Sequence, residues 1–176
     1  MFREDLAEKY PALFSPGQQG QLQVSFELLE IAPPEELISN VNLIPTAGDQ
    51  WLVIRDKNDH WDIPGGTLEP GETYLQTIQR EMREEAGAQL HTFQLFGAFH
   101  YHSSAEEPYR PHLPHPEFYR VVGVGKVEVI GVPNDPDAHV IGIELITVAQ
   151  AVERFRKQGR ADLAALYLLA AEFIKN

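Results

Sequence analysis

The 176-residue sequence contains no cysteine. This absence excludes thiol nucleophiles, disulfide frameworks and zinc sites built on cysteine. Basic residues are also scarce, with 14 Lys and Arg against 26 Asp and Glu, and the formal net charge is −12. Nonspecific nucleic-acid binding and attachment to anionic membranes both need a basic face, so this balance argues against either partner.

Long apolar runs are missing as well. No stretch approaches the roughly 20 apolar residues of a membrane span, and the first residues lack the apolar core of a secretory signal. We therefore expect a cytoplasmic protein with no membrane partner. A length of 176 residues with 43% hydrophobic residues is typical of one globular domain that can fold without disulfides or a structural metal.

The order of apolar patterns predicts an α+β fold, because strands and helices mix without strict alternation. Helices are expected over residues 4–10, 73–86, 148–158 and 161–175, and strands over residues 21–31, 41–46, 51–55, 90–102, 117–130 and 139–147. Gly48-Asp49 predicts a hairpin between the second and third strands, and the segment 63–66 is expected to break regular structure. A Pro- and His-rich loop, residues 103–116, is longer than usual, which favours a functional role.

The predicted helix over residues 73–86 carries the chemistry. Thr73 and Gln76 form a capping-box pattern at its start. Glu81, Glu84 and Glu85 are spaced i, i+3 and i+4, so they are neighbours on one face. Like charges at this spacing destabilise a helix and raise one another's pKa unless a cation neutralises them. A divalent metal site and a surface helix laced with ion pairs are both consistent with the spacing alone.

The loop before this helix favours the metal. Pro64-Gly65-Gly66 removes side chains where the backbone must approach another group closely, and Pro70-Gly71 makes a second tight turn. Backbone carbonyls in such a loop can join carboxylates as oxygen ligands, which Mg²⁺ prefers. The segment is therefore suited to a site for a metal and a phosphate.

The segment Gly66–Ala88 resembles the Nudix box. Seven fixed positions of that pattern are present: Gly66, Glu72, Arg80, Glu81, Glu84, Glu85 and Gly87. Ala88 departs from it, because the family usually has a bulkier aliphatic residue there. The resemblance implies a mixed β-sheet sandwiched between helices (α/β/α), formed by residues 41–176. Residues 1–40 would be an N-terminal extension of unknown role that belongs to the same globular unit.

The resemblance also implies the activity and the roles of the box residues. The family hydrolyses the diphosphate linkage of nucleoside diphosphate derivatives with Mg²⁺, and Mn²⁺ is an alternative. Glu81, Glu84, Glu85 and the Gly65 carbonyl match its metal ligands. Glu81 matches the position most often given a base role, whereas Arg80 and Glu72 match positions that orient the loop and the helix. The expected partner is a small nucleotide-type substrate.

Residues outside the box are weaker candidates. A further acid could come from Glu117, Asp135, Asp137 or Glu144, and we select Glu117 and Glu144 because each lies on or at the edge of an apolar strand. Tyr109 and Arg110 could contact a base and a phosphate, and Trp61 could line the site. The four histidines at 100, 102, 112 and 115 more simply belong to a surface or a pocket edge than to a zinc site. The apolar stripe of the last helix predicts core packing, with a homodimer contact as the alternative.

Three functions can be compared on the fold that the resemblance implies, and the residues present favour the first of them. The first is a metal-dependent hydrolase acting on ADP-ribose, a nucleotide sugar or a nucleoside triphosphate. The second is a non-catalytic Nudix-fold module that binds a nucleotide or regulates another protein, which the complete set of box carboxylates disfavours. The third, isomerase chemistry on the same fold, needs a cysteine that the chain lacks.

Overall fold

The computed structural model describes residues 3–137 and 139–175. Its helices are α1 (Arg3–Lys9), α2 (Pro11–Phe14), α3 (Tyr74–Ala86), α4 (Val148–Lys157) and α5 (Ala161–Lys175), with a 3₁₀ turn at Glu35–Leu37. Its strands are β1 (Gly17–Gln19), β2 (Leu22–Leu28), β3 (Ile38–Ala47), β4 (Gln50–Asp56), β5 (Trp61–Asp62), β6 (Gly65–Thr67), β7 (Ala88–Leu90), β8 (Gln94–Ser103), β9 (Glu117–Val129) and β10 (Val140–Ile146).

The strands form a mixed sheet in the order β1-β2-β8-β9-β3-β4-β10. Every described pair is antiparallel except β3 and β9, which run parallel at the centre with Val41 opposite Val121. The short strands β5, β6 and β7 pair with β4, β3 and β9. At one end β3 pairs with β6, and at its other end it pairs with β4. The sheet is therefore split between β6 and β4, beside the start of the Nudix-box segment.

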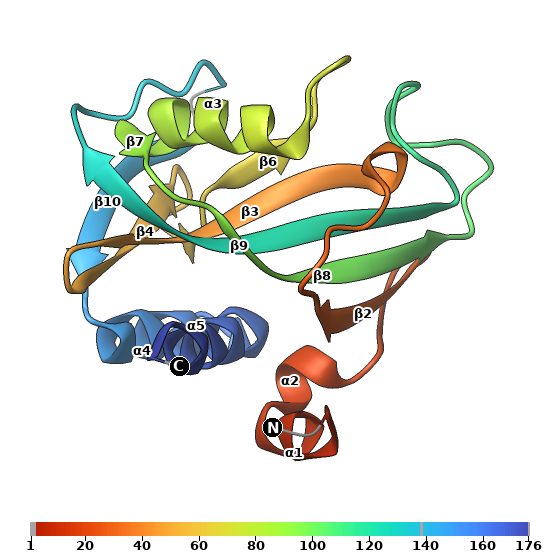
Figure 1. Ribbon diagram of the computed structural model, residues 1–176, viewed down its shortest axis with the longest axis horizontal. Coiled ribbons are helices and arrows are strands. Elements are labelled where there is room, and N and C mark those ends of the chain that lie inside the picture. Colours follow the sequence, from red (N-terminus) through yellow and green to blue (C-terminus); the bar gives the residue numbers. More distant parts are fainter. Residues whose placement is uncertain (1–2, 138, 176) are drawn as a thin grey trace.

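Helices cover both faces of the sheet (Figure 1), which confirms the predicted α/β/α arrangement. On one face α3 buries Ile78, Met82 and Ala86 against β3 and β4. On the other face α2, α4 and α5 pack on alternate residues of the same strands, with Phe155, Leu166 and Tyr167 fully buried. Alternation along a strand sends successive side chains to opposite faces, so each central strand supplies both cores.

Helix α3 begins and ends as its sequence predicts. The Thr73 hydroxyl accepts from the Gln76 N–H, and the Gln76 side chain accepts from the Thr73 N–H, which completes the capping box. Gly87 ends the helix in a left-handed conformation with φ of 57°. The apolar stripe of α5 lies in the core, as expected.

Three expectations need correction. The strand predicted over residues 90–102 is divided into β7 and β8, because the N–H groups of His91 and Thr92 both turn to the Lys126 carbonyl. The segment 63–66 was expected to lack regular structure, yet Gly65 and Gly66 begin β6 and pair with β3. Pro11 ends α1 as expected, but it also starts the one-turn helix α2, where a missing N–H costs nothing.

Residues before the predicted domain boundary at 41 pack against the rest of the chain. Strand β2 pairs with β8 over its whole length. Leu6, Tyr10 and Leu13 of the α1–α2 segment are buried in the core that contains α5. The Tyr10 hydroxyl donates to the Glu172 carboxylate at 2.6 Å. No helix in the described part of the chain is both long enough and apolar enough to cross a bilayer.

Candidate functional site

Arg80 ties three box carboxylates together at the start of the site. Its guanidinium donates to Glu72 through Nε (2.9 Å) and Nη2 (3.0 Å), and through Nη1 to Glu81 (2.8 Å) and Glu84 (3.2 Å). Glu72 also accepts from the Thr77 hydroxyl at 2.8 Å. These contacts hold the loop before α3 against the helix and orient two of its carboxylates.

The two glycines bring the backbone into contact with the remaining carboxylates. The Gly65 N–H donates to Glu85 Oε2 at 2.8 Å. A Cβ added at Gly66 would lie 1.9 Å from Glu81 Oε1, so only glycine leaves room for that carboxylate. Strand β6 thus places its backbone directly beside Glu81 and Glu85.

Burial changes the acidity of this group. The pKa of Glu85 is raised to about 8, mainly by burial and also by the negative charges of Glu81, Asp135 and Asp62, against the opposing hydrogen bond from the Gly65 N–H. Burial also raises the pKa of Glu81, although Arg80 counteracts it. One arginine does not neutralise this concentration of carboxylates. A cation bound beside Glu81 and Glu85 would stabilise their charged forms.

The residues present fit a hard divalent cation by chemistry and by position, although they are not preassembled around one. Glu81, Glu84, Glu85 and the Gly65 backbone supply oxygen donors from adjoining elements. Within the described ranges, however, no three carboxylate or imidazole groups converge as a ready metal cluster. Glu81 and Glu84 instead point to Arg80, and Glu85 to the Gly65 N–H.

Asp135 lies outside the box, but its charge acts on both Glu81 and Glu85. Its carboxylate accepts from the N–H groups of Asp137 (3.0 Å), His139 (2.7 Å) and Val140 (2.9 Å). The Asn134 N–H donates to the Glu84 carbonyl at 2.8 Å, which fixes the Asp135 loop to the end of α3. Asp135 was one of four acids considered from the sequence and was not among the two selected.

The two selected acids lie elsewhere. Glu144 pairs with Arg154 at 2.5 Å. Its register opposite Val53 places it on the sheet face covered by α4, whereas α3 covers the other face. Glu117 starts β9 and lies 3.7 Å from His102 and 3.9 Å from His100. Neither carboxylate joins the box cluster.

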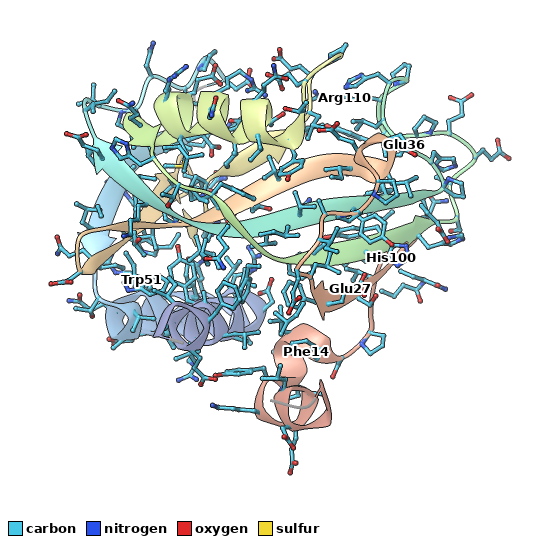
Figure 2. All side chains as sticks on the ribbon, in the orientation of Figure 1. Phe14, Glu27, Glu36, Trp51, His100 and Arg110 are labelled. Carbon is cyan, nitrogen blue, oxygen red and sulfur yellow. The ribbon has the colours of Figure 1, made fainter. Side chains whose placement is uncertain are left out.

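The candidate substrate-binding residues are separated as well. Trp61 packs on the core near α4, with the Arg154 guanidinium 4.2 Å from its ring centroid. Tyr109 is 84% exposed and has Arg110 5.5 Å from its ring centroid. Arg110 extends from its loop toward the segment that leads into α3 (Figure 2). The His112 ring bonds the Leu68 carbonyl at 2.8 Å, which joins the same two segments.

A cavity of about 710 Å³ opens at the split in the sheet and reaches the Glu85 carboxylate. Glu85, Gly65 and Gly66 line one part of it, and Phe26 and Phe99 line another. Residues of the N-terminal segment, from Ala12 to Gln19, also line it, so the region before residue 41 contributes directly to the site. A second cavity of about 500 Å³ lies beneath the loop over residues 103–116 and includes Tyr109.

Asp62 was not foreseen from the sequence. It lines the larger cavity together with Glu85, and burial raises its pKa against the opposing charge of Arg160. The only signal in the sequence was its position three residues before the glycine pair. Arg120, which lines both cavities, was also missed, because it lies on a strand outside the box and belongs to no motif there.

Comparisons with known proteins find relatives by sequence. Human 8-oxo-dGDP phosphatase NUDT18 is 48% identical over 33 residues, which is 19% of this chain and 10% of that protein. The putative 8-oxo-dGTP diphosphatase YtkD of Bacillus subtilis is 28% identical over 81 residues, 46% of this chain and 49% of that protein. The chain therefore matches at most about half the length of these curated relatives.

A solved structure shares the fold. The pyrophosphohydrolase BsRppH of Bacillus subtilis superposes with a TM-score of 0.55 at 20% identity, covering 70% of this chain and 72% of that one. The sequence profile of the NUDIX domain matches residues 37–167. Because this match spans most of the chain and includes every fixed residue of the box, the chain belongs to the Nudix family.

Proposed function

We propose that this protein is a metal-dependent pyrophosphohydrolase that cleaves the diphosphate linkage of a nucleotide derivative. The observation that carries the proposal is the position of Glu85, which accepts from the Gly65 N–H and lines a cavity large enough for a nucleotide, while Glu81 lies beside it against Gly66. Glu81, Glu84, Glu85 and the Gly65 carbonyl would hold Mg²⁺ or Mn²⁺. When bound, such a cation would mask phosphate charge and favour ionisation of the attacking water.

The residues of the chain have separate tasks in this reaction. The oxygen of water forms a new bond to phosphorus while the bond from phosphorus to the bridging oxygen breaks. We assign acceptance of the water proton to Glu81, because its carboxylate lies against the Gly66 backbone at the box position that the family resemblance associates with the base. Arg80 orients Glu81 and Glu84, and Glu72 orients Arg80.

The proposed linkage and the relatives suggest a group of candidate substrates. ADP-ribose, nucleotide sugars and nucleoside triphosphates all present the linkage that this site would cleave. The names of the two curated relatives add the oxidised purine deoxynucleotides 8-oxo-dGTP and 8-oxo-dGDP to this group. A panel of these compounds, assayed for released phosphate and nucleotide products with Mg²⁺, tests the proposal.

Removing the metal or a ligand should abolish turnover without unfolding the protein. Chelation with EDTA should stop hydrolysis, and added Mg²⁺ or Mn²⁺ should restore it. Glu84→Gln and Glu85→Gln should each lower kcat by about 100-fold or more, because the site loses one charged ligand. Glu153→Gln is the matched control, since Glu153 is exposed on α4 and pairs with Lys157 at the surface.

Two results would count against this assignment. Rates like the wild type from both ligand variants would show that the box carboxylates do not form the site. Metal-independent nucleotide binding with no cleavage anywhere in the panel would favour the alternative, a non-catalytic binding module.

A further inference from the structure

The larger cavity and the cavity beneath the loop over residues 103–116 meet at four residues. Gln19, Asn40, Tyr101 and Arg120 line both. The two cavities therefore adjoin, and together they extend from Glu85 at the split in the sheet to the space beneath that loop. With volumes of about 710 and 500 Å³, each part alone could accommodate a group the size of a nucleoside.

Arg120 lies between the glycine-containing strand β6 and the cavity beneath the loop over residues 103–116. On β9 it lies opposite Asn40 of β3, and Asn40 lies opposite Thr67 of β6. Neighbouring strands are about 4.8 Å apart, so the Arg120 backbone is about 10 Å from the glycine-containing strand. An arginine side chain at this separation can contact a phosphate of a ligand whose reacting phosphate lies beside Glu85.

Among the residues that the structure describes, no carboxylate forms an ion pair with the Arg120 guanidinium. Of the two arginines that line the larger cavity, Arg160 pairs with Asp162 at 2.9 Å and lies 3.9 Å from Asp62. In the described ranges, the Arg120 side chain contacts the Tyr101 ring and makes neither a hydrogen bond nor an ion pair. The positive charge of Arg120 lowers the pKa of Asp62, and the charge of Arg160 lowers it more strongly.

Aromatic stacking holds Arg120 in place. The guanidinium lies 5.6 Å from the centroid of the Tyr101 ring, and Tyr101 stacks on Phe118 at 5.0 Å with 8° between the planes. Tyr101 is only 5% exposed, so packing holds the ring against which the Arg120 guanidinium lies. A half-buried guanidinium that is oriented but unpaired is suited to bind a phosphate, because its N–H groups match phosphate oxygens in pairs.

We propose that Arg120 binds a phosphate oxygen of the substrate, and that the group carried by that phosphate occupies the cavity beneath the loop over residues 103–116. This inference rests on the proposed function and narrows its substrate class. The favoured substrate is a diphosphate with an organic group at each end, such as ADP-ribose or a nucleotide sugar. A nucleoside triphosphate would fill one cavity and leave the other empty.

Binding of uncleavable ligands separates this inference from the hydrolase proposal. The probes are the α,β-methylene analogues of ADP-ribose and of ATP, titrated calorimetrically with Mg²⁺ present. Arg120→Gln should raise the Kd of the ADP-ribose analogue by about 10- to 100-fold, because a charge-assisted contact is lost. Arg120→Lys should recover part of the loss, and Arg156→Gln, which removes an exposed charge on α4, should change the Kd less than about twofold.

A second variant tests the cavity beneath the loop. Ala105 lines it, so Ala105→Trp should weaken the ADP-ribose analogue more than about tenfold and leave the ATP analogue unchanged. Glu106→Trp is the control, because Glu106 is exposed on the same loop and does not line the cavity. Thermal unfolding of each variant shows that it is folded.

The outcomes are distinct. Unchanged binding of the ADP-ribose analogue to folded Arg120→Gln would overturn the assignment of Arg120. Equal effects of Ala105→Trp on both analogues would overturn the preference for a substrate with two organic ends. If the analogues bind as expected but none of the cleavable compounds is hydrolysed, the hydrolase proposal fails and the binding assignment stands.

Discussion

A single missing methyl group decides where the Glu81 carboxylate can lie. The Cβ of any other residue at position 66 would meet Glu81 Oε1 at 1.9 Å. The φ angle of Gly66 is not in the left-handed region, so the backbone itself would accept alanine. The glycine at this position is therefore required by space beside the carboxylate.

Gly66→Ala should consequently impair the reaction more than the fold. The added methyl should turn Glu81 away from its position, and we expect kcat to fall about 10- to 100-fold, as displacements near 1 Å commonly cost. The midpoint of thermal unfolding should change little, because the flexible carboxylate can move. Gly142→Ala is the control, since a Cβ there meets no atom within 4 Å. Full activity in Gly66→Ala would show that the position of Glu81 is not critical.

At the scale of the element, Glu72 fastens the loop before α3 to the helix. Its carboxylate accepts from Arg80 and Thr77 on the helix and from the Glu69 N–H in the loop. The hydrogen bonds from Arg80 are the largest cause that lowers the pKa of Glu72, from 4.5 to about 2. The ion pair between Arg80 and Glu72 joins the loop to the helix, and it requires the ionised form of Glu72.

The stabilisation by Glu72 should therefore be lost in acid. Because its pKa is lower in the folded state, its contribution is complete above about pH 5 and declines as the pH falls toward 2. We expect Glu72→Gln to lower the free energy of unfolding by on the order of 2 kcal/mol at pH 6, and the difference from wild type to narrow by about half at pH 3. Urea unfolding at the two pH values measures this. A difference independent of pH would contradict it, and Glu69→Gln in the same loop serves as control.

Whether a site residue could be found from the sequence depends on the element that carries it. The box residues could be located because one helix and its preceding loop fix their spacing, and the capping box of α3 confirms that local pattern. Asp62, Asp135 and Arg120 come from three other segments that only the sheet brings together. Glu144 was selected for its apolar strand, but alternation along β10 puts it opposite Val53, on the face away from α3. Which face a strand residue occupies depends on tertiary pairing, and no local pattern reports it.

Across the whole molecule, the first 40 residues and the remainder share one core. Leu13 of α2 is 3% exposed, belongs to the cluster that contains α5, and also lines the larger cavity. Phe14 packs edge-on against Phe26 of β2 at 5.5 Å. Sequence alone placed a boundary near residue 41 because the family resemblance begins there. The packing supports our proposal that both parts form a single globular unit.

Whether the N-terminal segment unfolds together with the rest of the chain can be tested by measuring unfolding with two probes. Leu13→Ala should lower the free energy of unfolding by about 2–4 kcal/mol, as expected for a buried leucine. The loss should be seen equally by the fluorescence of Trp51 and Trp61, which lie outside the N-terminal segment, and by circular dichroism. Gln18→Ala, at an exposed position in β1, should have little effect. A tryptophan transition that Leu13→Ala leaves unmoved would show that the N-terminal segment unfolds separately.

The parallel pairing of β3 with β9 determines the order in which a growing chain can complete this structure. Val41 and Val121 are register partners, so the centre of the sheet joins segments made far apart in time during translation. The box carboxylates are synthesised well before β9, but the sheet that supports β6 and α3 lacks its middle strand until residue 129 has emerged. Long-range pairing of this kind is slow to form. A ribosome-bound chain that ends before Glu117 should therefore carry the complete box in its sequence and still lack the organised cavity.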